Sequence, residues 1–198
     1  MSESSVNKER RTWLLATCAV GGVGAAATAV PFVASITPSE RAKAAGASVE
    51  VDITNLAPGQ KLTVEWRGKP VWIMRRTPEQ LAALESLDGE MADPMSERNA
   101  LPTPEYAKNR HRSIKPEVFV GIGICTHLGC SPVDKFQTGA QPSLPDNWEG
   151  GYFCPCHGST FDLAGRVFKN KPAPDNLEIP PHMYVSDNVL LIGEDKQA

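Results

Sequence analysis

The chain has 198 residues, of which 41% are hydrophobic and 22% are charged, a size that allows one globular domain and a short appendage but hardly more. Its formal net charge of −3 gives no general affinity for nucleic acid, so we expect no nucleic-acid partner. The 17 prolines and 16 glycines lie mostly after residue 57 and favour a loop-rich β domain over a helical bundle.

An uncharged segment lies near the N-terminus, between Trp13 and Ile36. It contains about two dozen residues, which is enough for a helix to cross the hydrocarbon core of a membrane. Pro31 is expected to kink such a helix or to mark a weak point in it, and Cys18 is expected to act as a small apolar residue. We predict a transmembrane anchor over residues 13–36, with a cleaved secretory signal as the alternative.

Residues 1–12 precede this anchor and carry Arg10 and Arg11 side by side. A twin arginine before a weakly hydrophobic segment resembles the signal of the twin-arginine export route, and the alternative is an ordinary positively charged flank. Both interpretations leave the N-terminus in the cytoplasm and export the remainder. Residues 37–48 hold no large apolar side chain, so we predict a flexible tether there, part of which can continue the helix as far as Gly46.

Residues 49–198 are predicted to form an all-β head of short antiparallel strands. Alternating apolar and polar side chains indicate strands at residues 49–56, 62–66 and 71–76, and the last two pair across a turn at residues 67–70. A final hairpin is predicted from residues 183–186 and 189–192.

The middle of the head is predicted to contain a short helix and an irregular segment before the next strand. Thr77 and Gln80 form a predicted capping box that opens a short helix over residues 81–87, which ends near Gly89. Residues 90–117 are polar and punctuated by proline, so we expect an excursion over the surface. The apolar residues 118–124 predict a buried strand that runs into Cys125.

Four of the five cysteines lie in two short motifs, CTHLGC at residues 125–130 (box one) and CPCHGS at residues 154–159 (box two). Their four cysteines and two histidines are too many ligands for one tetrahedral zinc ion. In one physical solution, one Cys and one His of each box bind a metal centre, and the remaining cysteines join the two loops by a disulfide. Such a disulfide persists only in an oxidising compartment, in agreement with the predicted export.

The two boxes resemble the cluster-binding motifs of Rieske iron–sulfur proteins, in which two histidines replace two cysteines on one iron of a [2Fe–2S] cluster. Gly165 and the proline loop (residues 171–174) resemble the segment that follows box two in the Rieske subunits of cytochrome bc complexes of the bacterial respiratory type. The order of anchor, tether, β head, boxes and proline loop matches this family over nearly the whole chain. The resemblance implies an all-β Rieske head with a cluster-binding subdomain at about 118–178.

The resemblance also implies a role for each box residue. The thiolates of Cys125 and Cys154 would bind one iron, and the imidazoles of His127 and His157 would bind the other. Cys130 and Cys156 would form the disulfide. His157 would accept a hydrogen bond from ubiquinol, and Leu128 would form part of the apolar tip that enters the quinol pocket. Pro172 would belong to the loop that covers the cluster.

One position departs from the family pattern. Ser159 matches a hydroxyl that donates to a bridging sulfide, but Phe161 stands where many members carry a tyrosine that donates to a ligating cysteine sulfur. Hydrogen bonds to sulfur stabilise the more negative reduced cluster. We therefore predict a midpoint potential below that of relatives that carry the tyrosine.

The implied function is electron transfer, with proton release, from ubiquinol to a c-type cytochrome, by a subunit that is not a complete enzyme alone. The implied partners are a cytochrome b subunit, a c-type cytochrome subunit and membrane lipid, in a dimeric complex in the bacterial inner membrane with the head in the periplasm. A Rieske small subunit of another oxidoreductase, such as an arsenite oxidase, is the alternative, and a structural zinc module is a third hypothesis. Among the remaining residues, we expect His111 and His182 at the surface, and three aromatic residues packed beneath the loops: Trp148, Tyr152 and Phe153.

Overall fold

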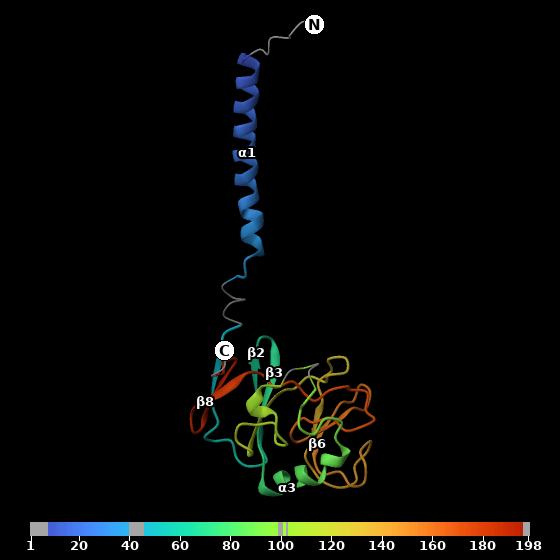
Figure 1. Cartoon of the computed structure of the whole chain (residues 1–198). Helices are drawn as coiled ribbons and strands as arrows, with labels where there is room; N and C mark the ends of the chain where they lie inside the picture. The colour runs from blue at the N-terminus through green and yellow to red at the C-terminus, as the bar shows by residue number, and fades with distance from the viewer. Residues whose placement is uncertain (1–7, 40–45, 99–100, 102, 196–198) are drawn as a thin grey trace. The chain divides into compact units, whose positions relative to one another are not determined.

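The computed structural model describes residues 8–39, 46–98, 101 and 103–195, and the chain divides into two compact units, Met1–Ala44 and Ala45–Ala198 (Figure 1). The first unit holds helix α1 (Lys8–Ile36), whose 29 residues are long and apolar enough to cross a membrane. At 1.5 Å per residue the helix is about 43 Å long, which exceeds a hydrocarbon core of about 30 Å. The helix continues through Pro31 to Ile36. Half of the predicted tether, residues 40–45, lies outside the described residues.

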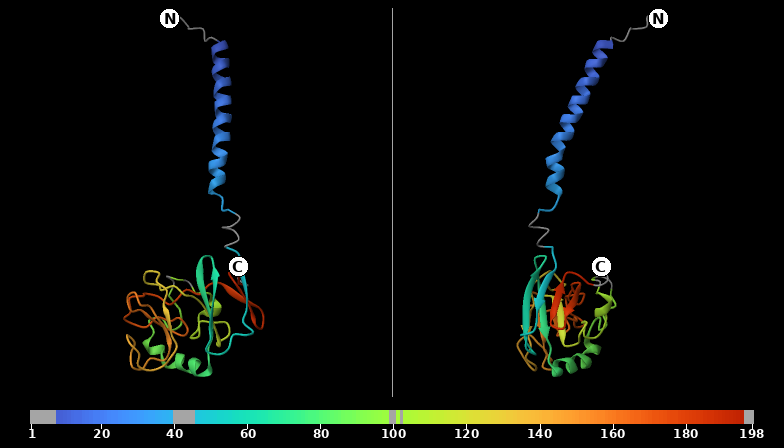
Figure 2. Two further views of the ribbon diagram at one scale, coloured as in Figure 1. Left: turned by 180° about the vertical axis from the view of Figure 1, so that it is seen from behind. Right: turned by 90° about the vertical axis from the view of Figure 1, so that its left-hand side faces the viewer.

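Within the described residues of the second unit, the strands form three antiparallel sheets of three strands each. Figures 1 and 2 show the ribbon of this unit from three sides. In spatial order the strands are β1 (Val49–Asp52), β9 (Val189–Ile192) and β8 (His182–Ser186); β2 (Lys61–Trp66), β3 (Lys69–Arg75) and β4 (Val118–Ile122); and β5 (Val133–Lys135), β6 (Gly151–Phe153) and β7 (Thr160–Asp162). Apolar side chains of the first two sheets share one core, which includes Val51, Val71 and Leu190. The predicted all-β head is confirmed.

Local chemistry explains where the first strands end. Strand β1 stops at Asp52, four residues before the predicted end, because the Asp52 carboxylate accepts a hydrogen bond from the Thr54 N–H and turns the chain. Trp66 pairs with Lys69, so the β2–β3 turn has only Arg67 and Gly68 at its centre. Both have positive φ, 51° and 71°, as a two-residue hairpin turn that follows the twist of its strands requires.

The predicted capping box is present. The Thr77 hydroxyl accepts a hydrogen bond from the Gln80 N–H, and the Gln80 side chain accepts one from the Thr77 N–H, so helix α3 spans Pro78–Ser86. Two single-turn 3-10 helices follow, η1 (Asp88–Glu90) and η2 (Glu105–Ala107), and both belong to the predicted surface excursion or its start.

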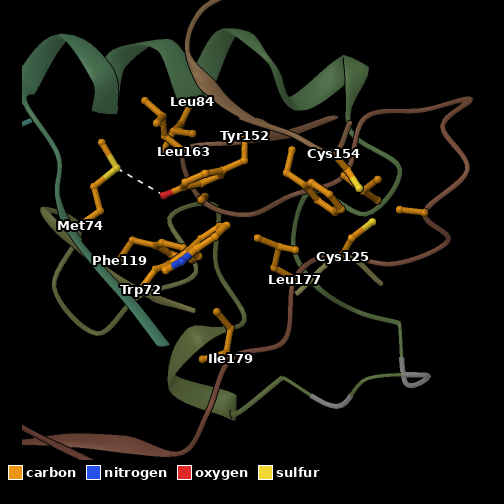
Figure 3. Packing of buried hydrophobic residues seen from close by; sticks show 14 of the residues in the cluster. Trp72, Met74, Leu84, Phe119, Cys125, Tyr152, Cys154, Leu163, Leu177 and Ile179 are labelled. Carbon is orange, nitrogen blue, oxygen red and sulfur yellow. Dashed lines mark hydrogen bonds between the residues drawn. The ribbon is translucent and has the colours of Figure 1, made fainter. Parts of the chain in front are cut away.

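A second core joins the β2–β3–β4 sheet to the β5–β6–β7 sheet (Figure 3). The Trp72 ring stacks on the Tyr152 ring with centroids 4.7 Å apart, and the Tyr152 hydroxyl lies 3.5 Å from the Met74 sulfur. Figure 3 places Cys125 and Cys154 next to each other at one end of this cluster. Tyr152 thus belongs to the same core as the two buried cysteines, as predicted, whereas Trp148 is buried in a separate cluster.

His182 is a correction, because it was expected at the surface and is only 2% exposed. It opens β8, one residue before the predicted start of that strand, and so it faces inward. Its Nδ1 lies 2.8 Å from the Pro180 carbonyl, and its ring meets the Tyr106 ring edge-on. Burial lowers the pKa of His182, so the neutral imidazole is the form that packs there. His111 is half-buried.

Candidate metal centre

Box one is a tight loop at the end of the segment that follows β4. The Cys125 N–H donates to the Cys130 carbonyl over 2.7 Å, and the Gly129 N–H donates to the Cys125 carbonyl over 3.0 Å. Gly129 has a φ of 81°, a conformation that costs an L-residue free energy. An added Cβ would meet no heavy atom within 4 Å, so the backbone conformation, and not a lack of space, requires glycine here.

Box two has the same pattern of backbone hydrogen bonds as box one. The Cys154 N–H donates to the Ser159 carbonyl over 2.8 Å, and the Gly158 N–H donates to the Cys154 carbonyl over 3.0 Å. Gly158 has a φ of 77°, and a Cβ at this position would also meet no heavy atom within 4 Å. Each box therefore begins with a cysteine, turns at a glycine four residues later and closes on the residue after that glycine.

The third sheet brings the two boxes together. Phe153 of β6 pairs with Thr160 of β7, so box two is the loop of a β hairpin. Phe153 also lies opposite Val133 of β5, which follows box one closely in the chain. The end of box one is therefore held beside the start of box two.

A disulfide joins Cys130 to Cys156, as the family resemblance implied. The sulfurs of Cys130, Cys154 and Cys156 lie within 4.8 Å of one another, but the disulfide occupies two of them. In the two boxes, free thiols thus remain on Cys125 and Cys154. The His127 and His157 rings meet edge-on with centroids 4.7 Å apart. Each box accordingly retains one free thiol and one imidazole, the four groups that the family resemblance names as ligands.

The four donor groups differ in exposure. The Cys125 and Cys154 side chains are buried, His127 is half-buried, and His157 is exposed. Burial raises the pKa of Cys125, while hydrogen bonds from the His127 N–H and the Ser159 hydroxyl act in the opposite direction. A buried thiol of this kind becomes a thiolate when a positive metal centre replaces its proton.

The His127 ring offers the strongest local sign that this site binds a metal. Its Nδ1 is buried and has no hydrogen-bond partner among the residues that the structure describes. A buried polar atom without a partner costs free energy, and coordination of a metal by this nitrogen removes that cost.

Ser159 closes box two and Phe161 follows it in β7, and both are fully buried. The Ser159 hydroxyl oxygen accepts a hydrogen bond from the Ala173 N–H over 3.0 Å, which ties box two to the proline loop. In box one, the Thr126 hydroxyl donates to the Asp175 carbonyl over 2.6 Å. The sequence placed Ala173 in the proline loop, but it did not indicate Thr126 or Asp175, because nothing in the spacing of the boxes singles them out.

The turn after β7 explains Gly165. Its φ is 68°, and a Cβ there would lie 2.9 Å from the Phe119 ring. The buried Arg112 guanidinium donates to the carbonyls of Ala164, Gly165 and Leu177 over 3.1, 3.2 and 2.7 Å. Arg112 thereby joins the turn after box two to the segment after the proline loop.

Two of the predicted residues lie at the surface of the site. The Leu128 side chain is 71% exposed, although leucine side chains are usually buried, and it stands next to His127 in box one. Pro172 in the proline loop is also exposed. An exposed leucine and the exposed His157 imidazole therefore mark the outer face of the two joined loops.

Comparisons with known proteins agree with this geometry. Residues 105–181 match the family described as "Rieske [2Fe-2S] domain", and residues 1–39 match "Ubiquitinol-cytochrome C reductase Fe-S subunit TAT signal". The ubiquinol-cytochrome c reductase iron-sulfur subunit of Allochromatium vinosum is 58% identical over 99% of this chain and 94% of that protein. The subunit of the same name from Bradyrhizobium diazoefficiens is 38% identical over 97% of this chain and 98% of that protein.

Among solved structures, a chain titled "Hyperthermophilic respiratory Complex III" is 28% identical, with a TM-score of 0.46, over 91% of this chain and 98% of that one. The residues present fit the group that a Rieske domain carries, since the two boxes hold two free thiols and two imidazoles in contact with each other, and one buried imidazole nitrogen is unpaired among the described residues. The chain therefore belongs to the family of ubiquinol–cytochrome c reductase iron–sulfur subunits, whose Rieske domain carries one [2Fe–2S] cluster.

Proposed function

We propose that this chain is the subunit of a quinol–cytochrome c oxidoreductase that takes one electron from ubiquinol and passes it to a c-type cytochrome. The observation that carries this proposal is the unequal exposure of the two imidazoles at the joined loops. His127 is half-buried, whereas His157 is exposed and can meet a substrate. The relatives' shared name supports ubiquinol as the electron donor.

The proposed ligands are the four donors that the disulfide leaves available. Cys125 and Cys154 would bind one iron, and His127 and His157 would bind the other. When bound, the cluster takes up and releases one electron, and its two neutral imidazole ligands make reduction easier than two more thiolates would. The disulfide between Cys130 and Cys156 holds the two loops at a fixed separation around that centre.

The exposed imidazole of His157 would hold the quinol and receive its proton. A hydroquinone gives up a proton together with each electron, and an imidazole nitrogen that faces outward can accept the hydrogen bond from its hydroxyl. Leu128 is 71% exposed beside His127 and would press against the walls of an apolar quinol pocket, where water is excluded.

Helix α1 would remain attached as an anchor in the bacterial inner membrane, with residues 1–12 in the cytoplasm and the head in the periplasm. Its length and apolarity support this proposal, as does the match of residues 1–39 to a twin-arginine signal. We propose functional boundaries at residues 13–36 for the anchor, 37–48 for the tether and 49–198 for the head, with the cluster-binding subdomain at about 118–178. The proposed partners are a cytochrome b subunit, a c-type cytochrome subunit, lipid and ubiquinol, in a dimeric complex.

Low-temperature electron paramagnetic resonance (EPR) on reduced membranes that contain this chain tests the proposal. We expect a Rieske-type signal that changes when an inhibitor of the quinol site is added, because the inhibitor replaces quinol at His157. A Rieske signal that is indifferent to the inhibitor would assign the chain to another redox partner. A purified chain that contains zinc and gives no signal would overturn the interpretation of both boxes.

A further inference from the structure

The segment that starts with the proline loop is fastened to both boxes within three residues. The Ala173 N–H donates to the Ser159 hydroxyl of box two, and the carbonyl of Asp175 accepts from the Thr126 hydroxyl of box one. Any movement of this short segment therefore acts on both boxes at once.

Arg98 binds this segment between those two attachments. One guanidinium nitrogen donates to the Pro174 carbonyl over 2.7 Å, and another donates to the Ala92 carbonyl over 3.1 Å. Arg98 itself is exposed and comes from the surface excursion, 76 residues before Pro174 in the chain. It thus links the outer excursion to the middle of the segment that covers the boxes.

Side-chain hydrogen bonds hold the backbone of the excursion around Arg98. The Asp93 carboxylate accepts hydrogen bonds from the backbone N–H groups of Glu97 and Arg98 over 2.9 and 3.0 Å. The buried Ser96 hydroxyl accepts from Arg112 Nε over 2.7 Å and from Asn176 Nδ2 over 3.1 Å. Arg98 therefore extends from a fixed base, and its guanidinium can hold a carbonyl in place.

The contact with Ala173 also orients the Ser159 hydroxyl. Because the Ser159 oxygen accepts from the Ala173 N–H, its own hydrogen remains available to the sulfur side of the site. The Ser159 carbonyl accepts the Cys154 N–H over 2.8 Å, so this hydroxyl belongs to the residue that closes box two onto its proposed cysteine ligand. A hydroxyl held in this way stabilises negative charge that arrives on the sulfurs.

We propose that Arg98 is a positioning residue for the cluster site. It fixes the proline loop at Pro174 and so maintains the hydrogen bond from the Ala173 N–H to the Ser159 hydroxyl. This inference rests on the proposed ligand set. Loss of the Arg98 contact lets the proline loop shift, weakens the orientation of the Ser159 hydroxyl and makes reduction of the site less favourable. The midpoint potential therefore falls, although Arg98 touches neither the ligands nor the substrate.

The test compares three variants in the intact complex, in membranes, by EPR-monitored redox titration. Arg98→Met removes the donors and the charge, Arg98→Lys keeps the charge without the two-pronged contact, and Lys171→Ala removes an equal charge from the proline loop itself. We expect the midpoint potential to fall in Arg98→Met, to fall by a smaller amount in Arg98→Lys, and to change least in Lys171→Ala. Amide hydrogen exchange at Ala173 should be about tenfold faster in Arg98→Met, as loss of a charge-assisted hydrogen bond predicts.

Unchanged potentials in both Arg98 variants would overturn the inference. So would an unchanged Arg98→Lys potential together with a Lys171→Ala shift as large as that of Arg98→Met, because charge alone would then explain the result. If Arg98→Met fails to assemble, an unchanged potential in Arg98→Lys overturns the inference by itself. The absence of a Rieske signal in the unmodified chain would remove the proposed function, whereas a normal signal with unshifted variants would remove this inference alone.

Discussion

Box one and box two have the same backbone and different side chains. Both begin with a buried cysteine, both turn at a glycine with positive φ, and both close with the same pair of hydrogen bonds. Among the positions that differ between them, His127 corresponds to Cys156, Leu128 to His157, and Cys130 to Ser159. The shared positions hold the cysteine that we propose as a ligand and the glycine at which the loop turns. The differing positions hold the histidines, the two disulfide cysteines and Leu128.

This division explains how two similar loops form an asymmetric site. The disulfide leaves box one from its last position and enters box two at its third. The histidine stands one position later in box two than in box one, and only the later one is exposed. The two loops share a backbone conformation, but their histidines differ by one position. This difference leaves one imidazole half-buried and exposes the other, which can then meet a substrate. Substitutions at shared positions should have matched effects, and substitutions at differing positions should not.

The largest effect is expected at the shared cysteines. Cys125→Ser and Cys154→Ser each remove one thiolate, and a site with three ligands should not retain the cluster. We expect both variants to lose the EPR signal and the bound iron completely, as measured in purified complexes. Retention of iron in either variant would show that this cysteine is not a ligand and that the boxes are not equivalent there.

The disulfide comes next. Cys130→Ser, Cys156→Ser and the double variant all remove the same bridge between residues 26 positions apart, so each should lose roughly 3 kcal/mol of stability. The temperature at which cluster absorbance is lost measures the effect, and Cys18→Ser serves as the control, since its thiol is free. Single variants that match the control, or that differ strongly from the double variant, would contradict this prediction.

A smaller and matched effect is expected at the two glycines. Gly129→Ala and Gly158→Ala each force a residue with a Cβ to keep a positive φ, at a cost of about 1 kcal/mol, while the space around both positions is open. The temperature at which cluster absorbance is lost should fall equally in the two variants, and Asn at either position should be tolerated better than Ala. A much larger fall in this temperature for one variant would mean that the glycine conformation matters more for stability in that box than in the other.

The smallest effect is expected at Phe161, which is fully buried in β7. Phe161→Tyr adds a hydroxyl that can donate to a ligating cysteine sulfur of box two or box one, and such a bond stabilises the reduced site. We predict a higher midpoint potential by redox titration, with Phe136→Tyr as the control, on a ring that meets the Tyr152 ring edge-on in the same core. An unchanged or lower potential would contradict the role assigned to this position.

Local patterns in the sequence predicted those features that depend on neighbouring residues. The capping box at Thr77, the β2–β3 hairpin and the final hairpin each follow from a few adjacent side chains. The disulfide and the donor set followed from the resemblance of the two boxes to a known family, and the Cys130–Cys156 bridge is confirmed.

Other features could not be predicted, for physical reasons. Strands β5, β6 and β7 have only three residues each, too few for an alternating pattern to stand out. The hydrogen bonds of Thr126 to Asp175 and of Arg98 to Pro174 join positions 49 and 76 residues apart, and no local pattern encodes them. The burial of His182 likewise depends on Tyr106, which lies in another part of the chain.

The central claim is that each box supplies one thiolate and one imidazole to a single cluster. Electron–nuclear double resonance on the reduced complex, with the histidines alone labelled with nitrogen-15, tests it most directly. The account predicts strong couplings from two histidine nitrogens, one from each box. Coupling from one histidine or from none would contradict it, because one box would then supply no imidazole to the metal.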